Sequence, residues 1–311
     1  DKYYFKRRSI IKMDITQNSF YALGYDYQET IEYKHLITER FDSDQVNQIK
    51  NILNSYNKYI DDSTTLRLTY EWIHSNQHYG KQFIESVVNN FLLYAIASNN
   101  KENISTFKYL LELASDVNSN MFQYGNTTLH MLCFNGHINL IEMLNSSNVN
   151  VDASIYNNIG LMPIHVLAYQ NNKDMISTMA TLFPESINYK TEKNENGLVH
   201  LLAYNNKKEH ISECINSKFN MDLKNSSKDS PFTIACKGDY SNIAELLYEN
   251  GANINTCDVL LETPLHSTVR NNNYTLTKMI YTGGGKSRAT NMRYETPYSI
   301  AIDQDNTEAL Q

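Results

Sequence analysis

The chain has 311 residues, a formal net charge of −7 at pH 7 and 41% hydrophobic residues, which is enough for one large or two ordinary domains. The negative charge argues against a nucleic-acid-binding protein, because such proteins carry a basic face, and no stretch approaches the ~18 continuous apolar residues that membrane insertion of a helix requires. The four cysteines form no Cys-x-x-Cys pair, so neither a zinc site nor a disulfide framework is indicated, and a reducing, cytoplasmic compartment is expected.

Residues 1–89 are predicted to form a mainly helical cap or small domain. Apolar residues recur at helical spacing in residues 43–59 and 65–74, and the longer segment 81–97 has one apolar face that continues into the next part of the chain. We interpret this region as a cap over the open end of a repeat array, with a separate functional domain as the alternative.

From about residue 90 the chain repeats itself. Short blocks of similar sequence end at positions 130, 165, 200, 233, 266 and 299, so their steps are 35, 35, 33, 33 and 33 residues. Each block is followed by a segment, such as 138–144 or 243–247, in which apolar residues recur three and four apart, as on one face of a helix. A period of about 33 residues predicts stacked helix pairs joined by turn-rich loops.

Two stretches of these repeats carry a resemblance to a known family. Thr263-Pro-Leu-His266 and Gly251-Ala-Asn-Ile-Asn255 are similar to the most diagnostic stretches of the ankyrin repeat family. The resemblance covers residues 90–311 and implies an all-α ankyrin-repeat solenoid of about seven helix-turn-helix repeats with β-hairpin-like loops, the last repeat being incomplete. One repeat departs from the pattern, because Gly197-Leu198 stands in place of Thr-Pro.

The motif also has a local physical meaning. Thr or Ser caps the inner helix, and Pro fits in the first turn, where no internal N–H bond is lost. No single repeat can bury its apolar face, so stability is expected to come from stacking. The resemblance implies that four repeat histidines hydrogen-bond the backbone of neighbouring loops, namely His130, His165, His200 and His266.

The resemblance further implies a binding surface on the concave side, formed by inner helices and loop tips. Four residues after the repeat histidine, the side chains that face the groove are three aromatics followed by two cations, and several loop tips are unusually apolar. Aromatic and Arg side chains dominate binding hot spots, although packing of these aromatics on their neighbours is the alternative. The predicted partner-binding residues are Phe134, Tyr169, Tyr204, Lys237, Arg270, Tyr124, Leu261 and Tyr294.

The predicted function is protein–protein recognition by a scaffold or adaptor, without catalysis, cofactor or metal in the repeats. The expected partner is a protein with an apolar patch and an acidic flank. Divergent ankyrin proteins also resemble effectors that intracellular bacteria or viruses send into the host cytosol, so that location is a further expectation.

The alternative is an enzyme that the repeats deliver to its substrate, with catalysis in the N-terminal segment or outside this chain. Residues 18–23 faintly resemble the nucleophile helix of papain-like thiol hydrolases, but Ser19 stands where Cys is needed, and the base would be His74 or His78. His74 and His78 without a third ligand are only a weak indication of a metal site. Gly283-Gly-Gly-Lys-Ser287 lacks the earlier glycine of a phosphate loop and is interpreted as an inter-repeat loop.

Overall fold

The computed structural model describes residues 97, 104–113, 116–120 and 123–310. The predicted N-terminal cap, its boundary at residue 89 and the candidate catalytic residues of that segment lie outside this part of the chain. The described residues form helices and turns and contain no strand. No helix among them is long and apolar enough to cross a bilayer.

The helices follow one another in pairs separated by loops. The first described ones are α7 (Ile104–Leu113), η1 (Gln123–Gly125), α8 (Thr128–Asn135) and α9 (Ile138–Ser146). They are followed by α10 (Pro163–Val166), α11 (Asp174–Leu182), η2 (Pro184–Asn188), α12 (Leu198–Tyr204), α13 (Lys208–Asn216), α14 (Pro231–Gly238), α15 (Ser241–Glu249), α16 (Pro264–Arg270), α17 (Tyr274–Thr282), α18 (Pro297–Asp303) and α19 (Thr307–Leu310).

The chain divides into two compact units. One comprises Asp1–Met131, Met143–Val151 and Asn157–Ile159, and the other comprises Leu132–Glu142, Asp152–Tyr156 and Gly160–Gln311. Within the described part of the first unit, Phe107 and Leu111 of α7 are buried. A backbone hydrogen bond joins two loops of this unit: the Asn158 N–H donates to the Tyr124 carbonyl oxygen over 2.9 Å.

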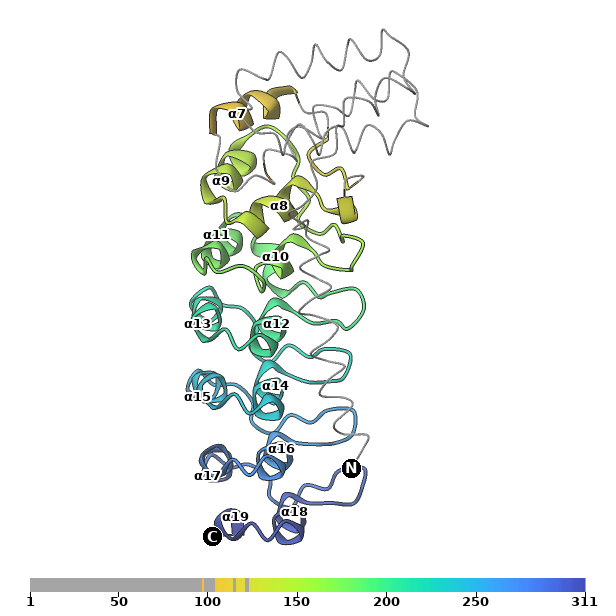
Figure 1. The fold of residues 1–311 in the computed structure, drawn as a ribbon, viewed down its shortest axis with the longest axis vertical. Coiled ribbons are helices and arrows are strands. Elements are labelled where there is room, and N and C mark those ends of the chain that lie inside the picture. The colour runs from red at the N-terminus through yellow and green to blue at the C-terminus, as the bar shows by residue number, and fades with distance from the viewer. Residues whose placement is uncertain (1–96, 98–103, 114–115, 121–122, 311) are drawn as a thin grey trace, which may run out of the picture. The chain divides into compact units, whose positions relative to one another are not determined.

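In the second unit, helix pairs stack along one axis. Figure 1 shows the inner helices α10, α12, α14, α16 and α18 in one column and the outer helices α11, α13, α15, α17 and α19 in a second, with the hairpin loops projecting on the far side of the inner column. The predicted all-α solenoid of helix pairs is confirmed for this unit.

Burial in this unit depends on the next helix pair. Ile164, Val199, Phe232 and Leu265 occupy the same position of successive inner helices, and each is at most 3% exposed. Burying a side chain of this size contributes about 1.5–3 kcal/mol. Tyr298 holds the same position in α18, the last inner helix described, and is 59% exposed. The apolar face of each pair is therefore covered by its neighbour and not by its own repeat.

A histidine ties each of several inner helices to the hairpin that follows. His200 Nδ1 accepts the backbone N–H of Gly197 at 3.1 Å, and its Nε2 lies 3.0 Å from the Asp229 carbonyl oxygen. Because Nδ1 accepts a hydrogen bond, Nε2 must carry the proton of a neutral ring and donate it to the carbonyl. His165 and His266 make the corresponding pair of bonds. In the first unit, His130 Nδ1 accepts the Thr127 N–H over 3.1 Å.

Amide side chains form a second set of links between repeats. Asn205 donates from Nδ2 to the Ala168 carbonyl of the preceding repeat over 3.1 Å, and Asn271 donates to the Cys236 carbonyl over 3.0 Å. Both residues stand five positions after the repeat histidine, whereas Gln170 at the same position of an earlier repeat bonds the backbone of Asn172 in its own repeat. The bonds of Asn205 and Asn271 reach carbonyl groups at or just after the ends of the preceding inner helices, where the regular helical hydrogen-bond pattern stops.

The neutral histidines make stability depend on pH. Burial lowers the pKa of both His165 and His200 from 6.5 to about 4. Their stabilising contribution is therefore complete above pH 6.5 and is lost as pH falls toward 4, because the unfolded chain takes up protons that the folded chain excludes. We expect the free energy of unfolding to fall by on the order of 3 kcal/mol per histidine across this interval.

Urea unfolding between pH 7 and 4 measures this effect. His165→Gln/His200→Gln is the control, since carboxylates also titrate near the lower limit. Wild type should lose stability faster than this variant as the pH falls. Parallel curves for the two proteins would contradict the assignment.

Candidate partner-binding surface

The hairpin tips of the second unit turn through one residue with a left-handed backbone. This residue stands five positions before the repeat histidine or its replacement. Glycine accepts a positive φ freely, whereas another residue incurs about 1 kcal/mol or more. Gly160 (φ 82°) shows the residue that suits this position, whereas Glu195, Lys228, Leu261 and Tyr294 hold it in the other four tips with φ of 52°, 60°, 59° and 60°. Their side chains are therefore carried on the tips against a backbone cost.

Backbone hydrogen bonds join neighbouring tips. The Val259 N–H donates to the Ser227 carbonyl over 3.0 Å, and the Met292 N–H donates to the Leu260 carbonyl over the same distance. One tip is thus held against the next, and the side chains of residues 259–261 and 292–294 lie along one continuous edge. A partner that reaches this edge would meet a preformed surface.

The tips carry a run of exposed apolar side chains. Tyr294 is 91% exposed, Met292 62% and Leu261 46%, and Val259 and Leu260 are exposed as well. We call these five residues the tip patch. Val259 and Met292 were not among the predicted binding residues. The sequence does contain a signal for Val259, because three consecutive apolar residues in a turn, Val259–Leu261, are unusual where they do not contribute to the core.

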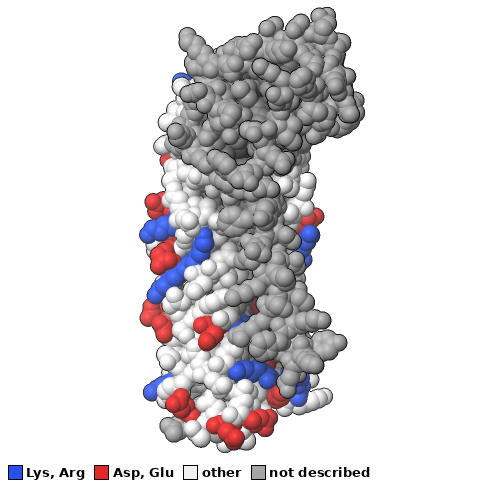
Figure 2. All heavy atoms as spheres, in the orientation of Figure 1, with Lys and Arg blue, Asp and Glu red and all other residues white. Residues whose placement is uncertain are grey.

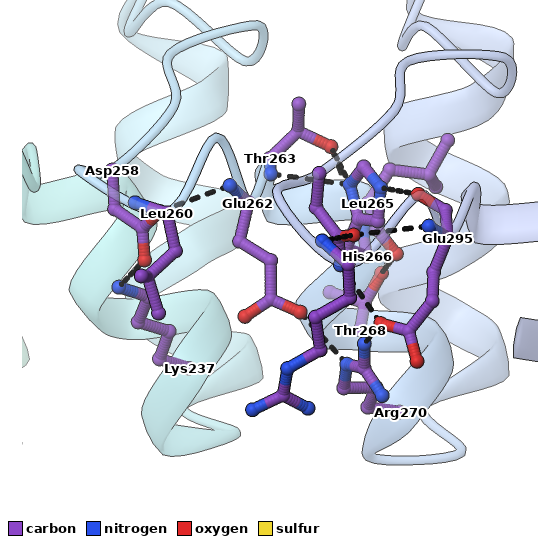
Figure 3. Close-up of polar contacts among 12 residues, drawn as sticks. Lys237, Asp258, Leu260, Glu262, Thr263, Leu265, His266, Thr268, Arg270 and Glu295 are labelled. Atoms are coloured by element: carbon purple, nitrogen blue, oxygen red, sulfur yellow. Dashed lines mark hydrogen bonds and ion pairs between the residues drawn. The ribbon is translucent and has the colours of Figure 1, made fainter.

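The two predicted binding cations lie between acidic side chains of the chain itself. In α14, Lys237 Nζ is 2.6 Å from Asp229 Oδ1 and 2.7 Å from Asp258 Oδ2. Asp229 precedes α14 and Asp258 belongs to the hairpin that follows it, so the lysine bridges two consecutive hairpins. Figure 3 shows its pair with Asp258. Burial works against the charge of Lys237, but these two carboxylates raise its pKa above the usual value.

Arg270 repeats this arrangement one repeat later. Its Nε donates to Glu262 Oε1 over 2.8 Å, and its NH2 group is paired with Glu295 (Figure 3). Glu262 precedes α16 and Glu295 belongs to the next hairpin. Both predicted cations are thus engaged within the fold, and Arg270 is only 20% exposed in its side chain.

The three predicted groove aromatics are less exposed than the tips. Phe134 lies on α8, Tyr204 ends α12, and Tyr169 follows α10, and each is only partly accessible. Burial raises the pKa of both Tyr169 and Tyr204 to about 12. Each therefore offers a partner only part of its surface. Tyr124, the remaining predicted residue, is half-buried and belongs to the first compact unit.

Positive and negative side chains are interspersed on the visible face of the second unit. On the face shown in Figure 2, Lys and Arg lie beside Asp and Glu over most of the described surface, with uncharged residues between them. Such interspersed charge favours solubility and does not itself mark a nucleic-acid face.

The described residues offer little for catalysis. No group of three or more His, Cys, Asp or Glu within them is placed to hold a metal ion. Cys133, Cys214 and Cys236 are buried, and burial raises the pKa of each thiol, which makes them poor nucleophiles. The segment Gly283–Ser287 follows the end of α17 as a loop. The arrangement in this part of the chain is suited to binding.

Lys237→Met tests the bridging role. We expect it to lower the free energy of unfolding by about 2–3 kcal/mol, because it leaves Asp229 and Asp258 buried beside each other without a counter-charge. Chemical denaturation measures the change. Lys228→Met, at an exposed tip, is the matched control and should remain within about 0.5 kcal/mol of wild type. Equal effects of the two substitutions would show that the bridge contributes nothing specific.

Tyr294 tests the cost of the left-handed tip. Its side chain is almost fully exposed, so removing it sacrifices little burial. Tyr294→Gly should be about 1 kcal/mol more stable than Tyr294→Ala, because only glycine relieves the backbone. Thermal unfolding of both variants gives the difference. An alanine variant at least as stable as the glycine variant would show that the backbone is unstrained here.

Comparisons with known proteins agree with this geometry. A family model described as ankyrin repeats in three copies matches residues 91–192, 164–258 and 198–291, which together span more than half of the chain. An "I-Kappa-B like protein C2" of Microplitis demolitor bracovirus (isolate Webb) is 30% identical over 146 residues, which cover 44% of this chain and 78% of that protein.

A solved structure has a similar fold. The ankyrin repeat domain of Bcl-3, described as a member of the IκB protein family, matches with a TM-score of 0.58 and 15% sequence identity. The match covers 67% of this chain and 92% of that one. At this identity the likeness concerns the fold alone.

Proposed function

The chain belongs to the ankyrin repeat family, and from this premise we propose that it is a protein-binding module whose partner docks on the inner-helix and hairpin-tip surface of the second compact unit. The repeats and the IκB-like relative support a protein-interaction role. The observation that carries the proposed location is the tip patch, where Leu261 and Tyr294 are exposed in a backbone conformation that disfavours them.

The physical argument rests on what an exposed apolar group costs. Contiguous apolar surface on a protein commonly marks a site that another molecule covers. The tip patch combines such surface with a rigid backbone, so little ordering entropy is lost on binding. In this proposal Tyr169 and Tyr204, which are partly exposed in two successive repeats, extend the surface along the inner helices.

The proposed role is that of an adaptor or scaffold acting in the cytosol of a host cell. The bracovirus origin of the IκB-like relative supports a host protein as the partner. A targeted enzyme with its chemistry in residues 1–89 is the second candidate, and that segment lies outside the described residues. Binding by the repeats is compatible with either form of the protein.

Affinity capture from a eukaryotic cell lysate, read by mass spectrometry, tests the proposal. The bait is the full 311-residue chain, compared with Tyr169→Ala/Tyr204→Ala and Leu261→Ser/Tyr294→Ser. A specific partner should be depleted at least tenfold with one or both of these variants, because each removes accessible aromatic or apolar side chains from the surface.

Tyr274→Ala/Tyr281→Ala is the matched control. These two tyrosines are exposed on the outer helix α17, so the variant removes similar side chains from another face. It should capture the partner as wild type does, and every variant should unfold cooperatively. A partner retained by all variants, or lost equally with the control, would contradict the proposed surface, and capture of no specific protein would contradict the proposed function.

A further inference from the structure

One outer helix of the second unit carries a histidine where other outer helices carry an aliphatic residue. The third residue of α13 is His210, which is only 7% exposed. The third residues of α11, α15 and α17 are Ile176, Ile243 and Leu276, and each is fully buried. His210 therefore occupies a core position of the outer column, which the fold fills elsewhere without an ionisable group.

The ring of His210 is not fully hydrogen-bonded. Its Nε2 is buried and has no hydrogen-bond partner among the described residues. A buried polar atom without a partner costs about 1–3 kcal/mol. The cost increases when the ring takes up a proton, because both nitrogens then become donors and the enclosed ring carries a charge.

Charged groups from two consecutive repeats act on His210. Burial lowers its pKa most, and the charge of Lys207, in the turn between α12 and α13, lowers the pKa further. The backbone of Gln170 and the carboxylate of Glu209 raise the pKa, and Lys173, just before α11, lowers it. Within the described chain, α15 also packs against α13 but adds no charged group to this set. The ring is therefore neutral at pH 7.

Lys207 links the repeat of α13 to the repeat before it. Its Nζ donates to the backbone carbonyl of Gln170, in the turn after α10, and lies 3.5 Å from Asn171 Oδ1. Burial lowers the pKa of Lys207 as well, so the ammonium group depends on these oxygens in place of water. Before α17, Asn273 reaches back to Asp239 in the same way with an uncharged amide.

We propose that His210 and Lys207 form a proton-sensitive contact between two consecutive repeats, in which proton uptake by His210 releases Lys207 from Gln170 and loosens α13 from α11. The protonated ring places a second positive charge beside the ammonium group, and both cations then compete for the same backbone carbonyl. Lys207 is the one that returns to water, since it is only partly buried whereas His210 is enclosed.

The loosening is confined to one interface of the stack. Each repeat contacts only its neighbours, so a weakened contact opens locally while the other repeats stay packed. Gln170 directly follows Tyr169, and Lys207 lies three residues after Tyr204. The affected interface is therefore the one between the repeats that carry these two tyrosines.

The contact is lost on the acid side of neutral pH. The pKa of His210 is below 6.5 in the closed stack and returns to its ordinary value when the interface opens. The contact is therefore complete above pH 6.5 and is lost as the pH falls through the lowered pKa.

Amide hydrogen exchange of the full chain at pH 7 and 5.5, corrected for the intrinsic exchange rates, tests this inference. In wild type the opening equilibrium of α11 and α13 should rise about three- to tenfold relative to that of α17, because a single proton allows at most about tenfold per pH unit. In His210→Ile, which restores the aliphatic residue of the other helices, the relative rise should stay below about twofold. An equal rise in both proteins would overturn the inference.

Lys207→Met and Lys208→Met form a matched pair, because both lysines are partly buried beside His210 but only Lys207 acts on its pKa. Titration of the imidazole by NMR should give a pKa below 6.5 in wild type and in Lys208→Met, and a higher pKa in Lys207→Met. Equal values in the two variants, or a wild-type pKa at or above 6.5, would contradict the contact. Neither measurement involves a partner, so a failure here leaves the proposed function standing.

Discussion

Each repeat of the stack is buried by its neighbour, and the other contacts of the fold follow from this arrangement. Leu265 is buried because a further helix pair lies against it, whereas Tyr298, one repeat later at the same position, is largely exposed. A stack of this kind has no closed core, so its stability is a sum of contacts between successive repeats. The histidine and amide bonds between repeats act at the same interfaces, which explains why they recur at fixed positions.

The ion pairs of Lys237 and Arg270 serve this stacking as well. Each cation lies on an inner helix and binds one acid before the helix and one acid in the next hairpin. A buried charge pair contributes less than its short distances suggest, because both groups lose hydration, but the loss of one member leaves a costly orphan. The pairs therefore hold the register of the hairpins.

The hairpin tips, unlike these ion pairs, have features that do not stabilise the folded chain. Leu261 and Tyr294 occupy positions whose backbone favours glycine, and both expose apolar surface to water. Neither feature stabilises the folded chain. Both are understandable if the side chains act in recognition, since strained and exposed residues are tolerated where they serve binding. The inner-helix tyrosines differ, because they are partly packed and so contribute to the fold and to the accessible surface together.

The period, the helix pairs and the positions of the repeat histidines are readable from the amino-acid sequence, because these features depend on local caps, turn residues and helical spacing. The sequence also places Leu261 and Tyr294 on the tips, since a short motif sets their distance from the histidine. The ion pairs of Lys237 and Arg270, in contrast, are visible only in the folded chain. The helical offset of these two cations is readable from the sequence, but their partners Asp258 and Glu295 lie 21 and 25 residues away, and side chains so distant along the chain meet only once the repeats have stacked.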